Sequence, residues 1–252
     1  MGRRMIFAGN WKMNKCFQEA IELTNDIISG LDDIGEREVI IFPPSIYVKE
    51  IIDKCKNTIV EVGVQNIYYK KEGAFTGEIS PMMVKDVGAK YVLIGHSERR
   101  HVFGETNDDV ERKVKAAFEY NLNPILCVGE LLEDREKGLS DDVVKKQVQE
   151  ALKDISEENI QNLIIAYEPV WAIGTGKVAT PEIAESMHHF IRKTLMNLYN
   201  DKLAQEIPIL YGGSVSPDNI KGLYSMNEID GVLVGGASLK SKSFLDIIHV
   251  DR

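Results

Sequence analysis

Short apolar runs, each followed by a segment with helical periodicity, recur along this chain and limit the folds that it can adopt. Most of the runs are continuously hydrophobic, which is typical of strands covered on both faces and hence of parallel sheets. The sequence therefore predicts about eight parallel strands. They are expected at residues 6–8, 39–42, 59–62, 91–94, 124–128, 163–167, 207–211 and 231–234.

The segments between these runs carry amphipathic helical patterns. The clearest pattern covers residues 181–200, with Thr180 as the expected N-cap and Pro181 in the first helical position. Thr106 and Ser140 are expected to cap two further helices, because their hydroxyls can accept a hydrogen bond from the first helical turn. The other helices are expected at residues 16–28, 107–120 and 141–152.

Parallel strands joined by right-handed helical crossovers form either an open doubly wound sheet or a closed barrel. An open dinucleotide-binding sheet should carry G-x-G-x-x-G after an early strand, whereas residues 9–12 read Gly-Asn-Trp-Lys. Eight repeats favour closure, and no linker or low-complexity stretch divides the 252 residues. We expect an α/β fold with a single domain over residues 1–252, an eight-stranded parallel (β/α)8 barrel.

Composition excludes several classes of function. The formal net charge of -9 argues against a nucleic-acid partner, because phosphate backbones are bound by clustered Lys and Arg. No segment is expected to act as a signal peptide or to span a membrane. Cys16, Cys55 and Cys127 are too scattered for a disulfide framework and are expected as small core residues of a cytoplasmic protein. The five histidines lack metal-ligand spacing, so we expect no metal and no cofactor.

Polar residues follow several predicted strands, where a barrel of this kind assembles its active site. Asn10 and Lys12 follow the first strand, His96 the fourth and Glu168 the sixth. Desolvation at a strand end should raise the pKa of Glu168 and make it a general base, although an ordinary ion pair is the alternative. His96 at a strand-to-helix junction should stay neutral and donate a hydrogen bond, or else serve only in packing. Lys12 suits an anionic substrate, or is a surface lysine.

Glycine loops follow the seventh and eighth strands, at residues 212–214 and 235–238. Glycine allows close backbone approach, and successive N–H groups can point at a phosphate. Either loop alone is adequately explained as a tight turn. Because both occur after neighbouring strands, we expect these two loops to bind a phosphate.

The segment after Glu168 has a bulky start and a small, glycine-containing tip, which suits a hinged lid; a fixed surface loop is the alternative. A P-loop is excluded because Val178 stands where Ser or Thr should bind magnesium. The predicted lid contains Pro169, Val170, Trp171, Ala172, Ile173, Thr175, Gly176 and Lys177.

Six strings closely resemble the triosephosphate isomerase family and together span almost the whole chain. They are GNWKMN at 9–14, GAFTGE at 73–78, YVLIGHSERR at 91–100, AYEPVWAIGTGK at 166–177, YGGS at 211–214 and LVGGAS at 233–238. The one departure noticed is Val64, where this family pattern has a smaller apolar residue. The resemblance implies the TIM barrel and the interconversion of dihydroxyacetone phosphate and D-glyceraldehyde 3-phosphate through an enediolate, in glycolysis and gluconeogenesis.

The same resemblance implies roles for individual residues. Glu168 would shuttle a proton between adjacent carbons, His96 would be the neutral electrophile, and Lys12 and Asn10 would contact the substrate. Glu98 would pair with Lys12.

The resemblance also assigns the phosphate site and a partner. Gly174 would join Ser214, Gly235 and Gly236 in binding the phosphate through backbone N–H groups. The long loop between Asn66 and Pro81, residues 66–81, would insert into a second copy of the chain. In that homodimer Thr76 would approach the neighbouring Asn10 and Lys12.

Two other functions remain open at this stage. A Schiff-base aldolase on the same barrel would use Lys12 as its nucleophile. A protein that binds phosphorylated metabolites without catalysis is the second alternative, although it would not need Glu168, His96 and Lys12 together.

Overall fold

Eight parallel strands close into a barrel in the computed structural model, which describes residues 3–172 and 179–251. Each strand pairs with the next, and the last returns to the first through the partners Ile6 and Gly231. The predicted (β/α)8 barrel is therefore confirmed. The strands are β1 (Ile6–Asn10), β2 (Glu38–Phe42), β3 (Val60–Val64), β4 (Tyr91–Ile94), β5 (Asn123–Val128), β6 (Ile164–Tyr167), β7 (Ile209–Tyr211) and β8 (Gly231–Val234).

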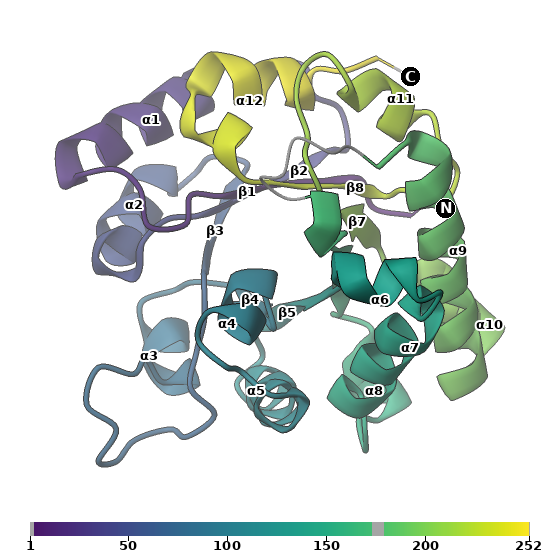
Figure 1. Ribbon diagram of the computed structural model, residues 1–252. Coiled ribbons are helices and arrows are strands. Elements are labelled where there is room, and N and C mark those ends of the chain that lie inside the picture. Colours follow the sequence, from purple (N-terminus) through teal and green to yellow (C-terminus); the bar gives the residue numbers. More distant parts are fainter. Residues whose placement is uncertain (1–2, 173–178, 252) are drawn as a thin grey trace.

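Helices surround the strands in the described part of the chain (Figure 1). The α-helices are α1 (Phe17–Ser29), α2 (Val48–Cys55), α3 (Pro81–Asp86), α4 (Ser97–His101), α5 (Asn107–Glu119), α6 (Leu132–Glu136), α7 (Ser140–Ala151), α8 (Glu157–Ile160), α9 (Pro181–Leu198), α10 (Asp201–Glu206), α11 (Ile220–Tyr224) and α12 (Ser241–Ile248). Three short 3-10 helices are η1 (Ser45–Tyr47), η2 (Val170–Ala172) and η3 (Gly236–Leu239).

The expected caps explain where two of the helices begin. The hydroxyl of Thr180 accepts a hydrogen bond from the third helical residue of α9, and Thr106 does the same for α5. Ser140 was wrongly expected to be a cap: it lies in the first turn of α7, and Leu139 occupies the cap position. A serine just before an acidic turn fits either position, which the sequence does not distinguish.

In every strand except β3, alternate residues belong to two different cores. Inside the barrel, Ile6 and Ala8 of β1 pack with Ile40 and Phe42 of β2. The intervening residue Phe7 belongs to the larger core between strands and helices. Both faces of the strands are therefore buried, which explains why the runs read as continuously hydrophobic.

The cysteines divide between core and surface. Cys55 and Cys127 are free and buried, as expected, but Cys16 is exposed and stands at the N-cap of α1. Its backbone N–H donates to Glu19 at 2.7 Å, so the residue ends a loop and contributes nothing to the core. Among the described residues no helix is both long enough and apolar enough to cross a membrane.

The long loop from β3 to α3 extends away from the barrel (Figure 1). Its two limbs are joined by a hydrogen bond of 2.8 Å from the N–H of Tyr68 to the carbonyl of Ile79. The ring of Tyr68 lies 4.2 Å from that of Tyr69 and 4.6 Å from that of Phe75. Aromatic packing thus gives this loop a fixed shape without regular secondary structure.

Candidate active site

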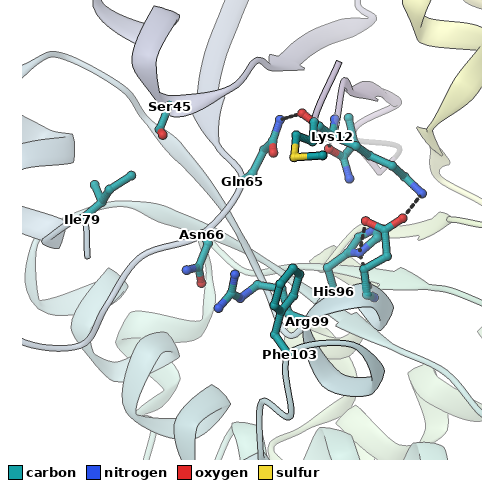
Figure 2. A pocket seen from close by; sticks show the side chains of 11 residues that line it. Lys12, Ser45, Gln65, Asn66, Ile79, His96, Arg99 and Phe103 are labelled. Carbon is teal, nitrogen blue, oxygen red and sulfur yellow. Dashed lines mark hydrogen bonds and ion pairs between the residues drawn. The ribbon is translucent and has the colours of Figure 1, made fainter. Parts of the chain in front are cut away.

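Lys12 is held in an unusual backbone conformation at the end of β1. Its φ of 51° lies in the left-handed region, which costs a non-glycine residue free energy. Neighbours hold it there: Asn10 Oδ1 accepts the Lys12 N–H at 3.0 Å, and Gln65 Nε2 donates to the Lys12 carbonyl at 2.8 Å. The ammonium lies 2.6 Å from Glu98 Oε1, as the resemblance implied. Figure 2 shows Gln65 and Lys12 joined in this way.

Glu168 and His96 form a buried pair at the mouth of the barrel. The Nε2 atom of His96 lies 2.9 Å from Glu168 Oε1, and the backbone N–H of Ser97 donates to Oε2 at 2.9 Å. The exposed fraction is 2% for Glu168 and 6% for His96. Two residues 72 positions apart therefore share one hydrogen-bonded cluster, as expected from barrel closure.

The pKa of Glu168 is shifted in the direction opposite to the one expected. Burial raises this pKa, but the charge and hydrogen bond of His96 and the N–H of Ser97 lower it, and the result is a lowered pKa. Here the carboxylate is stabilised as the anion. The expectation from desolvation alone was wrong because the partners come from a distant strand end.

Both ring nitrogens of His96 have a hydrogen-bonding partner. Burial lowers its pKa, whereas the carboxylate of Glu168 raises it, and the net direction is up while the two side chains touch. The backbone N–H of Glu98 donates to Nδ1 at 3.2 Å, so Nδ1 is the acceptor and the ring proton stands on Nε2. A neutral ring would therefore present an Nε2–H donor toward Glu168.

The glycine loops and the polar residues line one cavity of about 350 Å³. An added Cβ at Gly212 would lie 2.9 Å from Glu168 Cγ, and one at Gly235 would lie 3.5 Å from Lys12 Cε. The loops thus approach both the carboxylate and the cation. The cavity is lined by Asn10, Lys12, His96, Glu168, Gly212, Gly213, Ser214, Val215, Leu233, Gly235, Gly236 and Ala237.

The first residues of the predicted lid are anchored to the barrel. The indole N–H of Trp171 donates to Glu130 Oε1 at 2.8 Å, and the hydroxyl of Tyr167 donates to the same oxygen at 3.1 Å. The hydroxyl of Ser214 donates to the carbonyl of Ala172 at 2.9 Å, which joins the lid to a glycine loop. The remaining predicted residues, Ile173, Gly174, Thr175, Gly176 and Lys177, lie outside the described residues.

Sequence reasoning missed several residues that shape the site. Ser97 acts through its backbone N–H, which no side-chain pattern reveals. Gln65 and Glu130 follow β3 and β5, a position that the sequence does indicate, but their roles depend on partners in other loops. The buried hydroxyl of Tyr211 has no hydrogen-bond partner among the described residues, and an added Cβ at Gly213 would meet it. No group of three His, Cys, Asp or Glu residues suited to a metal occurs in the described ranges.

A second cavity, of about 300 Å³, opens beside the first and shares Asn10, Lys12 and His96 with it (Figure 2). Its outer wall includes Met13 and Phe103, whose exposed fractions are 96% and 69%. Apolar side chains that are this exposed next to a cavity are typical of a surface that another molecule covers.

Comparison with known proteins gives one consistent result. The model of the triosephosphate isomerase family matches residues 5–251. The triosephosphate isomerase of Clostridium tetani is 49% identical over 247 residues, which cover 98% of this chain and 96% of that protein. That of Carboxydothermus hydrogenoformans is 48% identical, with 98% of each chain covered. That of Dictyoglomus thermophilum is 49% identical, with 98% of this chain and 99% of that protein covered.

Proposed function

The chain belongs to the triosephosphate isomerase family, and we propose that it interconverts dihydroxyacetone phosphate and D-glyceraldehyde 3-phosphate, a step of glycolysis and gluconeogenesis. The observation that carries the proposal is one cavity lined by a carboxylate, an imidazole, an ammonium and two glycine loops. The two triose phosphates are isomers, so the reaction only relocates protons and needs no cofactor.

Glu168 is proposed as the base that moves a proton between adjacent carbons. To reach a substrate carbon, its carboxylate must leave the hydrogen bonds with His96 and Ser97. Those bonds are what lower its pKa, whereas burial raises it. When the carboxylate breaks these hydrogen bonds inside a water-poor cavity, its pKa rises. It is therefore a stronger base when it reaches the substrate.

His96 and Lys12 are proposed to stabilise the enediolate. Once Glu168 leaves, the Nε2–H of His96 is free to donate to the substrate oxygen, while the N–H of Glu98 keeps Nδ1 in place. Lys12 contributes a full positive charge, and Asn10 lies in the same cavity as a polar contact. Donors fixed in advance stabilise developing charge because they need no reorganisation.

The phosphate is proposed to bind at the N–H groups of Ser214, Gly235 and Gly236. The proximity of Gly235 to Lys12 Cε supports this placement, since a cation beside backbone N–H groups suits an anion. By family resemblance Gly174 would add a further N–H. The lid from Pro169 to Lys177 would then close over the phosphate and exclude water, which protects the enediolate from losing its phosphate.

A coupled isomerase assay on the purified chain and its Glu168→Gln variant tests the reaction. The variant keeps the shape of the side chain but cannot accept the proton, so kcat should fall by about 10²- to 10⁴-fold. An unmodified chain that binds triose phosphates without turnover would instead support the binding-protein alternative.

The Schiff-base aldolase is disfavoured by the ion pair of Lys12. A lysine attacks a carbonyl only as the neutral amine, whereas the ion pair of Lys12 with Glu98, at 2.6 Å, uses the ammonium. Treatment with borohydride in the presence of substrate should therefore leave the mass of the chain unchanged. A trapped adduct on Lys12 would reverse the assignment.

We also propose a homodimer in which residues 66–81 of one copy enter the second cavity of the other. The support is a loop fixed by aromatic packing, with Phe75 at its tip, and a cavity rimmed by the exposed Met13 and Phe103. Thr76 would then approach Asn10 and Lys12 of the neighbouring copy. A monomer with full activity at nanomolar concentration, measured by light scattering, would contradict this.

The remaining proposals concern the cell and the chain as a whole. Free Cys16, Cys55 and Cys127 suit the reducing cytoplasm, where the substrate would be processed. A site built from β1, β4, β6 and β8 draws on both ends of the chain, which supports the prediction of one domain over residues 1–252.

A further inference from the structure

Arg100, in α4, binds three separate parts of the barrel with one side chain. Its Nε donates to the carbonyl of Gly95 at 2.7 Å, Nη1 to Asn107 Oδ1 at 2.6 Å, and Nη2 to the carbonyl of Cys127 at 3.3 Å. These acceptors belong to the end of β4, the start of α5 and the end of β5. Neither the sequence patterns nor the proposed reaction gave this arginine a role.

The guanidinium joins β4 and β5 beyond the point where their ladder ends. The last paired residues are Ile94 and Leu126, so Gly95 and Cys127 are each one residue further along. Gly95 has a φ of 73°, and an added Cβ there would lie 2.7 Å from Arg100 Nη2. The backbone at Gly95 and the guanidinium therefore fit each other closely, and only glycine permits the contact.

The two carbonyls belong to the segments that carry the proposed catalytic pair. The carbonyl of Gly95 is part of the peptide that leads into His96. One residue beyond Cys127, the carbonyl of Val128 accepts the backbone N–H of Glu168 at 2.7 Å. A group that fixes both carbonyls thus sets the separation and direction of the imidazole and the carboxylate.

We infer that Arg100 is a positioning residue for the isomerisation, because its guanidinium clamps the peptides before His96 and Val128 and so fixes where the imidazole Nε2–H points. The inference rests on the proposed function. It also explains why arginine stands there: a planar fork of several N–H donors can serve three acceptors at once, whereas the ammonium of lysine is a compact point charge.

The outer side of the clamp is braced as well. Asn107, which accepts from Arg100, donates through Nδ2 to Glu150 Oε2 at 2.5 Å. Glu150 lies in α7, so the orientation of the guanidinium is set from a second helix. A chain of side chains thereby links the outer helices to the peptide in front of His96.

The test compares Arg100→Met and Arg100→Lys with Arg37→Met as the matched control. Arg37 also donates to a backbone carbonyl, that of Val250 at 2.7 Å, but it lies beside the start of β2, at the opposite mouth of the barrel. We expect Arg100→Met to lower kcat by about 10- to 100-fold, because small displacements of a catalytic group cost this much. KM should change by less than about threefold, since no contact to substrate is removed.

Further results separate positioning from general stabilisation. Arg100→Lys should retain part of the activity, and added guanidinium ion should partly restore Arg100→Met. The ¹⁵N resonances of His96 should shift in Arg100→Met and stay unchanged in Arg37→Met. A folded Arg100→Met protein with unaltered kcat and unaltered His96 resonances would overturn the inference.

Two further measurements apply if Arg100→Met does not fold or if the unmodified chain has no isomerase activity. If Arg100→Met does not fold, Asn107→Ala removes one of the three acceptors and should lower kcat by about threefold while shifting the His96 resonances; no change in either would overturn the inference. If the unmodified chain has no isomerase activity, the proposed function fails, whereas the His96 resonances still test the clamp.

Discussion

At the scale of single residues, the pKa values of Glu168 and His96 depend more on the contact between the two groups than on burial. Burial alone would raise the pKa of the carboxyl and lower that of the imidazole, and contact between the two groups reverses both shifts. Charge and hydrogen bonding therefore outweigh desolvation here. The carboxylate is consequently a weaker base while it rests against His96 than after it leaves.

This balance predicts how His96 should titrate. In the unmodified chain its pKa should lie above the ordinary 6.5 because Glu168 is negative. In Glu168→Gln the negative charge is gone, burial becomes the main influence, and the pKa should fall below 6.5. A titration of the His96 resonances followed by NMR measures both values. An unchanged pKa in the variant would mean that the two side chains do not interact in solution.

The same pair predicts a pH dependence of stability. The lowered pKa of Glu168 contributes stability above its ordinary value of 4.5, which is lost as the pH falls through the folded value. The raised pKa of His96 contributes stability below 6.5, which is lost as the pH rises through its folded value. The pair should thus stabilise most between pH 4.5 and 6.5. Urea unfolding should show the unmodified chain losing stability as the pH falls below 4.5 and as it rises above 6.5, and Glu168→Gln should lack both of these losses.

Gln65 supports the strained backbone of Lys12, so removing its side chain should lower the free energy of unfolding. Gln65→Ala would remove the side-chain amide that donates to the carbonyls of Lys12 and Phe42, and that of Phe42 would keep only the N–H of Trp11. Partly buried acceptors that lose a partner cost about 1–3 kcal/mol in the free energy of unfolding. Chemical denaturation measures this value, and Gln18→Ala, which removes an exposed helix pair with Glu22, should cost far less.

At the scale of elements, the capping residues at helix N-termini contribute to the free energy of unfolding. Thr106→Ala removes the hydroxyl that accepts from the N–H of Asp109, and should lower the free energy of unfolding by about 1 kcal/mol. Ser140→Ala is the matched control, because Ser140 lies in the first turn of α7 and makes no capping bond. Equal losses in the two variants would show that the cap of α5 contributes nothing.

The strands and helices were largely predictable because their signals are local. Hydrophobic runs located all eight strands, and capping residues placed the start of α9 and α5. Boundaries moved where burial was not uniform: Ile59 has an exposed fraction of 54%, and β3 begins at Val60. The pKa of Glu168 and the clamp of Arg100 were not predictable, since both depend on partners that only the closed barrel brings together.

At the scale of the whole molecule, the proposed dimer depends on a preformed loop. Phe75→Asp would place a charge at the loop tip and remove the packing on Tyr68, so the dimer dissociation constant should rise by at least about tenfold. Light scattering over a dilution series measures it. Leu139→Asp, at another exposed apolar position, should leave the dissociation constant unchanged.

Closure of the barrel pairs the first strand with the last, so the site is complete only when both strands are in place. Gly235 and Gly236 follow β8, which pairs with β1, while Lys12 and Asn10 follow or end β1. A chain still emerging from the ribosome lacks the final seam and exposes the edges of β1 and β7. Turnover therefore cannot begin during synthesis. The exposed strand edges of the growing chain must also be kept from pairing with other chains until β8 has been made.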